Sequence, residues 1–142
     1  AYDDLSTFKL YALDVGLLRQ LSELDASVLL LSTPGYMEYK GALAENYVLQ
    51  SLMAQFQASF RYWTSGNKAE VDFLLQYDNH IYPIEVKADQ NVTGKSLIQY
   101  EKLFQPACRI RYSMLNLKQD GNLINIPLFL ADKTKELLKD KS

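Results

Sequence analysis

The stretch from Glu70 to Asp89, EVDFLLQYDNHIYPIEVKAD, constrains the fold more than any other part of the chain. It predicts two strands, at 70–76 and 81–87, because both runs are rich in β-branched and aromatic residues. The polar residues 77–80 between them contain an Asp-Asn pair, which is typical of a tight turn. The stretch is therefore expected to form an antiparallel hairpin.

Three charged residues interrupt these apolar strands: Asp72 in the first, and Glu85 and Lys87 in the second. Side chains alternate between the two faces of a strand, so Glu85 and Lys87 share one face. In the first strand the same rule places Asp72 on one face, and Val71 and Phe73 on the other. If the strands pair, all three charged side chains can point to one side, and we expect the two carboxylates to converge.

Two carboxylates and an ammonium group are costly in such strands unless something compensates their charge. A divalent cation held by Asp72 and Glu85 would do so, since hard cations such as Mg²⁺ prefer carboxylate and carbonyl oxygens. Lys87 would then lie beside the metal. The alternative is an ordinary ion pair between Lys87 and one of the carboxylates on a solvated hairpin face.

A long helix is predicted to begin at residue 37 or 39 and to end at Gln57, with an apolar stripe formed by Val48, Leu49, Leu52 and Phe56. Glu45 precedes two residues of this stripe by three and four positions, so it lies on the same side of the helix. Its carboxylate either faces the core for a functional reason or lies partly exposed at the edge of the stripe.

The N-terminal residues predict a short strand at 8–13 and a helix capped by Asp14. Leucines follow at helical spacing, at positions 17, 18, 21 and 24. They predict either core packing or a docking surface for an upstream domain, and residues 1–35 are a candidate linker or docking segment. A turn is expected at 32–35, where the sequence is Ser-Thr-Pro-Gly.

The rest of the chain alternates strand and helix patterns. Strands are expected at 60–64, 108–115 and 123–126, a turn at 65–68 and at 121–122, a helix at 94–104, and a final helix with Pro127 in its first turn. Pro83 has no N–H and therefore favours an edge or a bulge at that point of its strand. The pattern predicts an α/β fold with a central mixed sheet, against which the Glu45 helix and the Gly94 helix pack.

The length of 142 residues predicts a single domain spanning 1–142. Cys108 is the only cysteine, which excludes a disulfide within the chain and fits a reducing cytoplasm. No apolar run approaches the ~18 residues that a membrane span needs. The net charge of −2 gives no overall basic footprint of the kind that DNA-binding domains usually have.

Two other motifs carry less weight. Gly94-Lys95-Ser96 resembles the end of a phosphate-binding loop, but Asp89 stands where that loop requires its first glycine. Lys95 and Ser96 at a helix start either hold a backbone phosphate weakly or form a solvated helix end. His80 is the only histidine and lies in a predicted turn, so a histidine-based metal site or a Ser-His-Asp triad is not available.

Four motifs occur in the order KLYALDVGLL, KGALAENYVLQSL, YWTSGNKAEVDFLL and IYPIEVKAD. The last two resemble the D…ExK core of the PD-(D/E)xK superfamily of restriction-endonuclease-like nucleases. Together the four resemble the nuclease-like domain at the C-terminus of many prokaryotic AAA-type ATPases, over about residues 8–130. The residue before Asp72 is Val71 and not proline, which is a departure from the superfamily pattern.

This resemblance implies a restriction-endonuclease-like fold and phosphodiester hydrolysis with Mg²⁺ or Mn²⁺. It implies that Asp72, Glu85 and the backbone carbonyl of Val86 bind the metal, that Glu45 completes the cluster, and that Lys87 assists the attacking water or stabilises the oxyanion. The expected partners are nucleic acid, with DNA as the expected form, and an ATPase domain that precedes this segment in a longer chain, because the sequence begins without methionine. The alternative is a non-catalytic interaction or regulatory domain of the ATPase that retains the nuclease fold.

Overall fold

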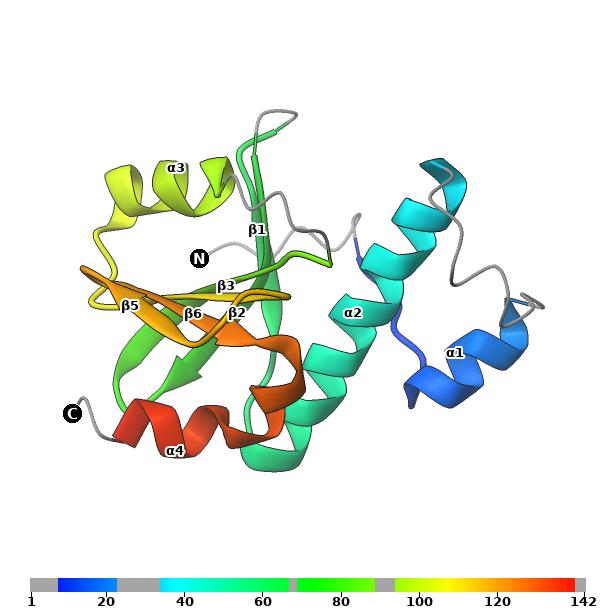
Figure 1. Cartoon of the computed structure of the whole chain (residues 1–142). Helices are drawn as coiled ribbons and strands as arrows, with labels where there is room; N and C mark the ends of the chain where they lie inside the picture. Colours follow the sequence, from blue (N-terminus) through cyan, green and yellow to red (C-terminus); the bar gives the residue numbers. More distant parts are fainter. Residues whose placement is uncertain (1–7, 23–33, 67–68, 89–93, 140–142) are drawn as a thin grey trace.

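The computed structural model of the chain describes residues 8–22, 34–66, 69–88 and 94–139 (Figure 1). In chain order the elements are α1 (Val15–Leu21), α2 (Pro34–Gln55), β1 (Arg61–Thr64), β2 (Glu70–Tyr77), β3 (His80–Val86), α3 (Lys95–Phe104), β4 (Arg109–Ser113), β5 (Lys118–Asp120), β6 (Leu123–Pro127), the 3-10 helix η2 (Leu128–Lys133) and α4 (Thr134–Lys139).

The strands of the described residues form one six-stranded sheet in the order β1-β2-β3-β4-β6-β5. The first three strands and the β5–β6 pair are antiparallel, whereas β3–β4 and β4–β6 are parallel. Helix α3 lies on one face of this sheet, and α2, η2 and α4 lie on the other (Figure 1). The predicted α/β class, a mixed sheet flanked by helices, is confirmed. No helix in the described part of the chain is long and apolar enough to cross a membrane.

The predicted hairpin is confirmed. β2 pairs with β3 from Phe73↔Ile84 to Tyr77↔His80. The two residues of the turn, Asp78 and Asn79, both have positive φ angles, of 49° and 61°. Asn and Asp tolerate this conformation, and such two-residue turns match the twist of paired strands.

Two apolar clusters cover the two faces of the sheet. The larger joins Val48 and Leu52 of α2, and Phe56 directly after α2, to the central strands, η2 and α4, and it includes Phe73, Ile84 and Val86. The smaller joins Val71 of β2 to Leu97 and Tyr100 of α3, with Trp63, Leu74 and Leu123 packed against it. The predicted apolar stripe of the long helix therefore lies in the main core.

A bulge in β2 changes which residues share a face. Arg61 pairs with Leu74 and Trp63 pairs with Val71, so two residues of β2, Asp72 and Phe73, lie opposite the single residue Tyr62. Val71 belongs to the α3 cluster and Phe73 to the α2 cluster. The expectation that these two side chains share a face is wrong, because an extra residue in one strand shifts the alternation by one.

The helix ends differ from their predicted positions. The structure starts α2 at Pro34, within the expected turn at 32–35, because proline is tolerated in the first helical turn, where its missing N–H has no partner in any case. Helix α3 begins at Lys95 with Gly94 at its N-cap, one residue later than predicted. Residues 32–33 of the predicted turn lie outside the described residues.

The strand predicted at 8–13 is not formed. Residues 8–12 form no regular structure, and α1 follows with the side chain of Asp14 accepting a hydrogen bond from the Leu17 amide at 2.8 Å. The predicted cap is thus confirmed. Core packing of the leucine stripe is not, because Leu17 and Leu21 are exposed and α1 has no buried residue. Leu24 of that stripe lies outside the described residues.

The C-terminal part contains one strand that was not predicted, β5, and β4 is shorter than expected. Pro127 ends β6 and caps η2, so it does not lie inside the first turn of one long final helix. Pro83 lies in a central strand opposite Leu74 of β2, but β3 pairs with β4 only from Ile84 onward, so Pro83 has no partner on the β4 side. This position agrees with the expected local edge.

Candidate functional site

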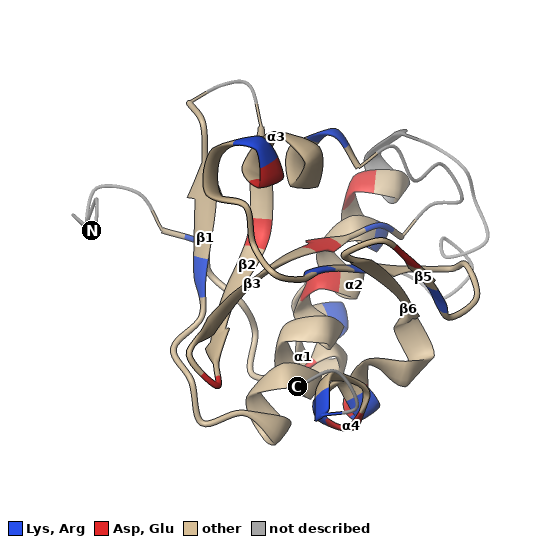
Figure 2. Ribbon diagram, turned by 90° about the vertical axis from the view of Figure 1, so that its left-hand side faces the viewer, with Lys and Arg blue, Asp and Glu red and all other residues tan. Residues whose placement is uncertain are grey.

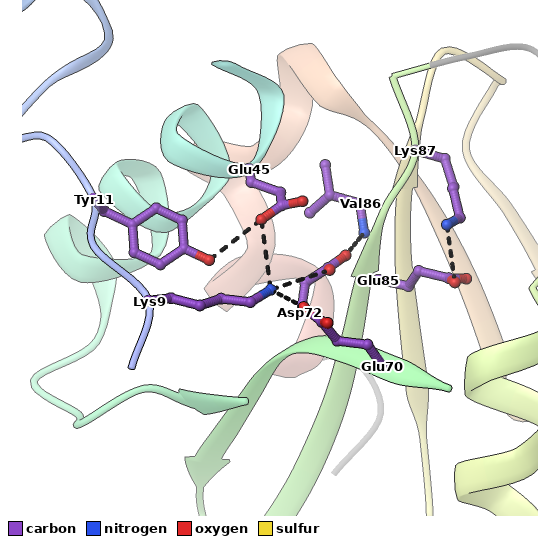
Figure 3. Close-up of polar contacts among 8 residues, drawn as sticks. All are labelled: Lys9, Tyr11, Glu45, Glu70, Asp72, Glu85, Val86 and Lys87. Carbon is purple, nitrogen blue, oxygen red and sulfur yellow. Dashed lines mark hydrogen bonds and ion pairs between the residues drawn. The ribbon is translucent and has the colours of Figure 1, made fainter. Parts of the chain in front are cut away.

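The predicted site residues lie around the C-terminal end of β3, but on two sides of that strand (Figure 3). Glu45 and Asp72 lie on the side of α2, together with the N-terminal segment. Glu85 and Lys87 lie on the side of α3 (Figure 3). The alternation along β3 explains the division, because Ile84 and Val86 on either side of Glu85 belong to the α2 cluster.

On the α2 side, Asp72 is fixed by the backbone of β3. Its Oδ2 atom accepts a hydrogen bond from the Val86 amide at 2.7 Å. The bulge in β2 turns the Asp72 side chain toward Glu45 of α2, so the carboxylate is not on the Glu85 side of β3. Asp72 therefore lies next to Glu85 along the sheet, but the two carboxylates lie on different sides of β3.

An ammonium group occupies the centre of this α2 side. Lys9 Nζ lies 3.8 Å from an oxygen of Glu45, 3.8 Å from an oxygen of Asp72, and in contact with the carboxylate of Glu70. It also lies 5.5 Å from the centre of the Tyr62 ring, within the range of a cation–π interaction. We call Glu45, Glu70 and Asp72 the carboxylate cluster; Lys9 is its counter-ion.

Tyr11 completes this arrangement. Its hydroxyl group donates a hydrogen bond to Glu45 Oε2 at 3.3 Å, and its ring lies 5.6 Å from that of Phe73. Burial raises the pKa of Tyr11, and the nearby charge of Glu45 raises it further. Tyr11 therefore stays protonated and acts as a hydrogen-bond donor to the carboxylate.

The pKa values of Asp72 and Lys9 are both raised from their ordinary values. Burial raises the pKa of Asp72 to about 7, and the charge of Glu45 adds to this rise, while the Val86 amide, Lys9 and Lys87 oppose it. Burial lowers the pKa of Lys9, but its hydrogen bond with Glu70 and the charges of Glu45 and Asp72 outweigh burial, so the net pKa is raised. Lys9 is accordingly a permanent cation at neutral pH.

On the α3 side, Glu85 is 2% exposed and pairs with Lys87, whose Nζ lies 3.2 Å from Glu85 Oε1. The other oxygen, Oε2, has no hydrogen-bond partner among the described residues. A Cβ atom on Gly94, at the start of α3, would lie 3.3 Å from Oε2 and 3.7 Å from Nη1 of Arg111. The Glu85 carboxylate therefore points to the α3 end and away from the carboxylate cluster.

This geometry corrects the expected convergence of the Asp72 and Glu85 carboxylates. Among the described residues, no group of three or more His, Cys, Asp or Glu side chains could hold a metal ion as arranged. The residues that would bind Mg²⁺ therefore do not fit one metal site in this arrangement. Instead, Glu45 and Asp72 share the ammonium group of Lys9, and Glu85 has that of Lys87.

Sequence reasoning missed Lys9, Tyr11 and Glu70 as members of the site. A signal was present in residues 8–11, Phe-Lys-Leu-Tyr, where polar and apolar side chains alternate. Phe8 and Leu10 are exposed, whereas Lys9 and Tyr11 point inward to the cluster. Residues 8–11 do alternate as an extended segment does, but their polar side chains face the protein and their apolar side chains face the solvent.

The weak nucleic-acid candidates lie at the first turn of α3. Lys95 is exposed and Ser96 is half-buried. Figure 2 shows Lys and Arg interspersed with Asp and Glu along the described chain, with no element that is basic throughout.

Comparison with known proteins identifies a family for this chain. A family described as "Domain of unknown function (DUF4143)" matches residues 40–129, which contain Glu45, Asp72, Glu85 and Lys87. No curated protein and no solved structure matches the chain. Because the matched residues make up more than half of its length, the chain belongs to the DUF4143 family.

Proposed function

We propose that this chain is a non-catalytic interaction or regulatory domain of an AAA-type ATPase, which retains a nuclease-like fold and its acidic residues. The observation that carries the proposal is the position of Lys9, whose ammonium group lies among Glu45, Glu70 and Asp72. The ordered motifs that resemble the C-terminal domain of such ATPases support the placement beside an ATPase.

The argument rests on charge compensation. Buried carboxylates need a cationic partner, and in a metal-dependent nuclease a divalent cation has that role. Here an ammonium group of the chain itself has it, so a metal ion would have to displace Lys9. Glu85, the other expected ligand, is turned to the α3 side and paired with Lys87.

A metal-dependent nuclease is the second candidate, and one observation favours it. The amide of Val86, the residue after Glu85, donates a hydrogen bond to the Asp72 carboxylate, so the two carboxylates are attached to neighbouring positions of β3. Glu85 Oε2 is a buried acceptor without a hydrogen-bond partner among the described residues. This candidate requires the two carboxylates to move to one side of β3. Asp72, Glu85, Glu45 and the Val86 carbonyl would then hold Mg²⁺ or Mn²⁺, with Lys87 beside them.

Cleavage and metal-induced stabilisation test the proposal together. The 142-residue chain is incubated with labelled single- and double-stranded DNA and RNA in millimolar Mg²⁺ or Mn²⁺, and its thermal unfolding is measured with and without each ion. We expect no cleavage above that of the Asp72→Ala variant, and no ion-dependent rise in melting temperature, since a ligand stabilises only the state that it binds.

The opposite result would replace the first proposal by the second. Metal-dependent cleavage that disappears in both Asp72→Ala and Lys87→Ala would show that these side chains act on a substrate. Removing one electrostatic stabiliser of a transition state commonly lowers the rate by ~10²–10³, which is far outside the error of such an assay. Lys133→Ala, which removes an exposed partner of Glu136, serves as the control lysine variant.

A further inference from the structure

The Glu85 carboxylate has one oxygen without a partner, and this oxygen points to the start of α3. Glu85 is 2% exposed, and Lys87 Nζ lies 3.2 Å from its Oε1 atom (Figure 3). The Oε2 atom is buried and has no hydrogen-bond partner among the described residues. Burying an acceptor without a donor is costly. Oε2 is therefore an acceptor that a donor group of a ligand can satisfy.

Gly94 leaves room for such a donor beside Oε2. A Cβ atom on this residue would lie 3.3 Å from Glu85 Oε2 and 3.7 Å from Arg111 Nη1. Because glycine has no Cβ atom, one oxygen of a ligand can take this position after a small shift, within reach of the carboxylate and the guanidinium group. Gly94 is half-buried and the Lys87 side chain is 35% exposed, so the position lies near the surface.

Positive charge surrounds this position. Arg111 lies opposite Glu85 on the neighbouring strand β4, Lys87 pairs with Glu85, and the exposed Lys95 is the first residue of α3. The first turn of α3 contains no acidic residue, and Gly94 forms no side-chain cap. The amides of this turn therefore add partial positive charge. One carboxylate does not balance three cationic side chains and a helix N-terminus, so the arrangement favours an anionic ligand.

We propose that the start of α3 binds a phosphate group in its protonated, singly charged form, with Gly94 providing the space and Glu85 accepting the proton in a hydrogen bond. The P–OH group donates to Glu85 Oε2, and the other phosphate oxygens accept from the first-turn amides of α3 and from Lys87 or Lys95. Two requirements select this chemistry, a negative charge for the cations and a proton for Oε2. Sulfate and phosphate diesters carry the charge but have no proton to donate.

The site is independent of the proposed function. It lies on the α3 side of β3, whereas the proposed function rests on Lys9 and the carboxylates of the α2 side. Phosphate binding is measured with a chelator present, so that neither a divalent cation nor cleavage enters the result. The phosphate site can therefore fail while the absence of cleavage stands, and cleavage can be found while phosphate binding is confirmed.

The first test compares phosphate with sulfate by calorimetry on the 142-residue chain at pH 6. A phosphate monoester loses its second proton with a pKa of about 6, so about half of it carries the proton at this pH. We expect phosphate to bind at least about tenfold more tightly than sulfate, because an unprotonated oxygen leaves Oε2 unpaired and is repelled by it. In Glu85→Gln the side-chain amide can donate or accept, so this preference should disappear. Equal affinity of the wild-type chain for both ions, or no phosphate binding at millimolar concentration, would overturn the proposal.

The second test fills the space beside Oε2 with a methyl group. Gly94→Ala should weaken phosphate binding at least about tenfold, because the new Cβ atom takes the position of the P–OH oxygen. Gly41→Ala is the matched control: its Cβ atom meets nothing within 4 Å in α2, and phosphate should bind as to the wild-type chain. Thermal unfolding checks that both variants are folded. Unchanged phosphate affinity in Gly94→Ala would contradict the site.

Two esters distinguish the sources of the phosphate group. Ethyl phosphate has an ionisable proton and diethyl phosphate has none. If ethyl phosphate binds with the same dependence on Gly94, the site accepts phosphorylated molecules; if inorganic phosphate alone binds so, it is a site for the free ion. Diethyl phosphate should not bind, and binding of the diester as tightly as of the monoester would overturn the role of Glu85 as acceptor of the proton.

Discussion

The Asp72 carboxyl group has a pKa set by opposing neighbours. Burial and the charge of Glu45 raise this pKa, and the Val86 amide, Lys9 and Lys87 lower it, with a net value of about 7. An aspartic acid in an unfolded chain ionises near pH 4. Folding therefore favours the protonated form of this residue, although one of its oxygens is held by a backbone amide.

The pH dependence of stability follows from this difference. Between about pH 4 and pH 7 the unfolded chain loses the Asp72 proton before the folded chain does, so the free energy of unfolding should fall as the pH rises through this range. A shift of this size corresponds to at most about 4 kcal/mol. Asp72→Asn keeps an acceptor for the Val86 amide and removes the titration, so it should be more stable than wild type at pH 8.

Urea unfolding of both proteins between pH 4.5 and pH 8 checks this prediction. Other carboxyl groups titrate in both proteins, so the difference between the two curves is the quantity to compare. Two parallel curves would show that the pKa of Asp72 is the same in the folded and unfolded chain.

The identity of the charged residues could be read from the sequence, but their grouping could not. Asp72, Glu85 and Lys87 were recognisable because each interrupts an apolar strand. The side to which Asp72 points depends on the bulge opposite Tyr62, which is a property of the pairing with β1 and not of β2 alone. The alternation at residues 8–11 indicates that Lys9 lies on one side of an extended segment, but its partner Asp72 is far away in the chain and local patterns do not identify it.

Among the elements, α2 connects the core to the candidate site. Its buried side chains Val48 and Leu52 pack on the sheet, about one and two turns from Glu45, while Asn46 and Gln50 accept hydrogen bonds from the Ala12 and Val15 amides. The helix and the β2–β3 hairpin were predictable because their signals are local, an apolar stripe and a two-residue turn. Strand β5 has three exposed polar residues and gave no such signal.

Adjacent residues of α2 provide a matched pair of stability variants. Leu52 is fully buried in the larger cluster, whereas Met53 is 62% exposed. Leu52→Ala leaves a cavity in the core and should lower the free energy of unfolding by about 2–5 kcal/mol. Met53→Ala should change it by no more than about 0.5 kcal/mol, as expected for a surface position. Chemical denaturation of the two variants measures both values, and similar losses would mean that α2 packs on the sheet through a different face.

For the whole molecule, the sheet separates two cores of unequal size. The cluster under α2, η2 and α4 contains most of the buried apolar residues, and the cluster under α3 has three buried members among the described residues. Residues 8–22 lie outside residues 40–129, which match the DUF4143 family, while the four predicted catalytic residues lie inside that range. The family match therefore covers the sheet, Glu45 and Asp72, but not Lys9, which is the counter-ion of these two carboxylates.

Unequal cores predict unequal local stability. Opening of α3 exposes less apolar surface than opening of α2, so it should require less free energy. In native-state hydrogen exchange, the Tyr100 amide of α3 should exchange faster than the Leu52 amide of α2 by at least about tenfold, which corresponds to ~1.4 kcal/mol. Equal protection at the two positions would indicate that the sheet and all its helices open as one unit.

The contacts of Lys9 also determine an order of events during synthesis. Lys9 leaves the ribosome before Glu45, Glu70 and Asp72, the residues that it contacts, and the β2–β3 hairpin must form before Asp72 is in place. Local hairpins form early, whereas contacts between distant segments require closure of a long loop. Lys9 is thus synthesised first and docks last, and in the nascent chain the carboxylates are brought together before their counter-ion arrives.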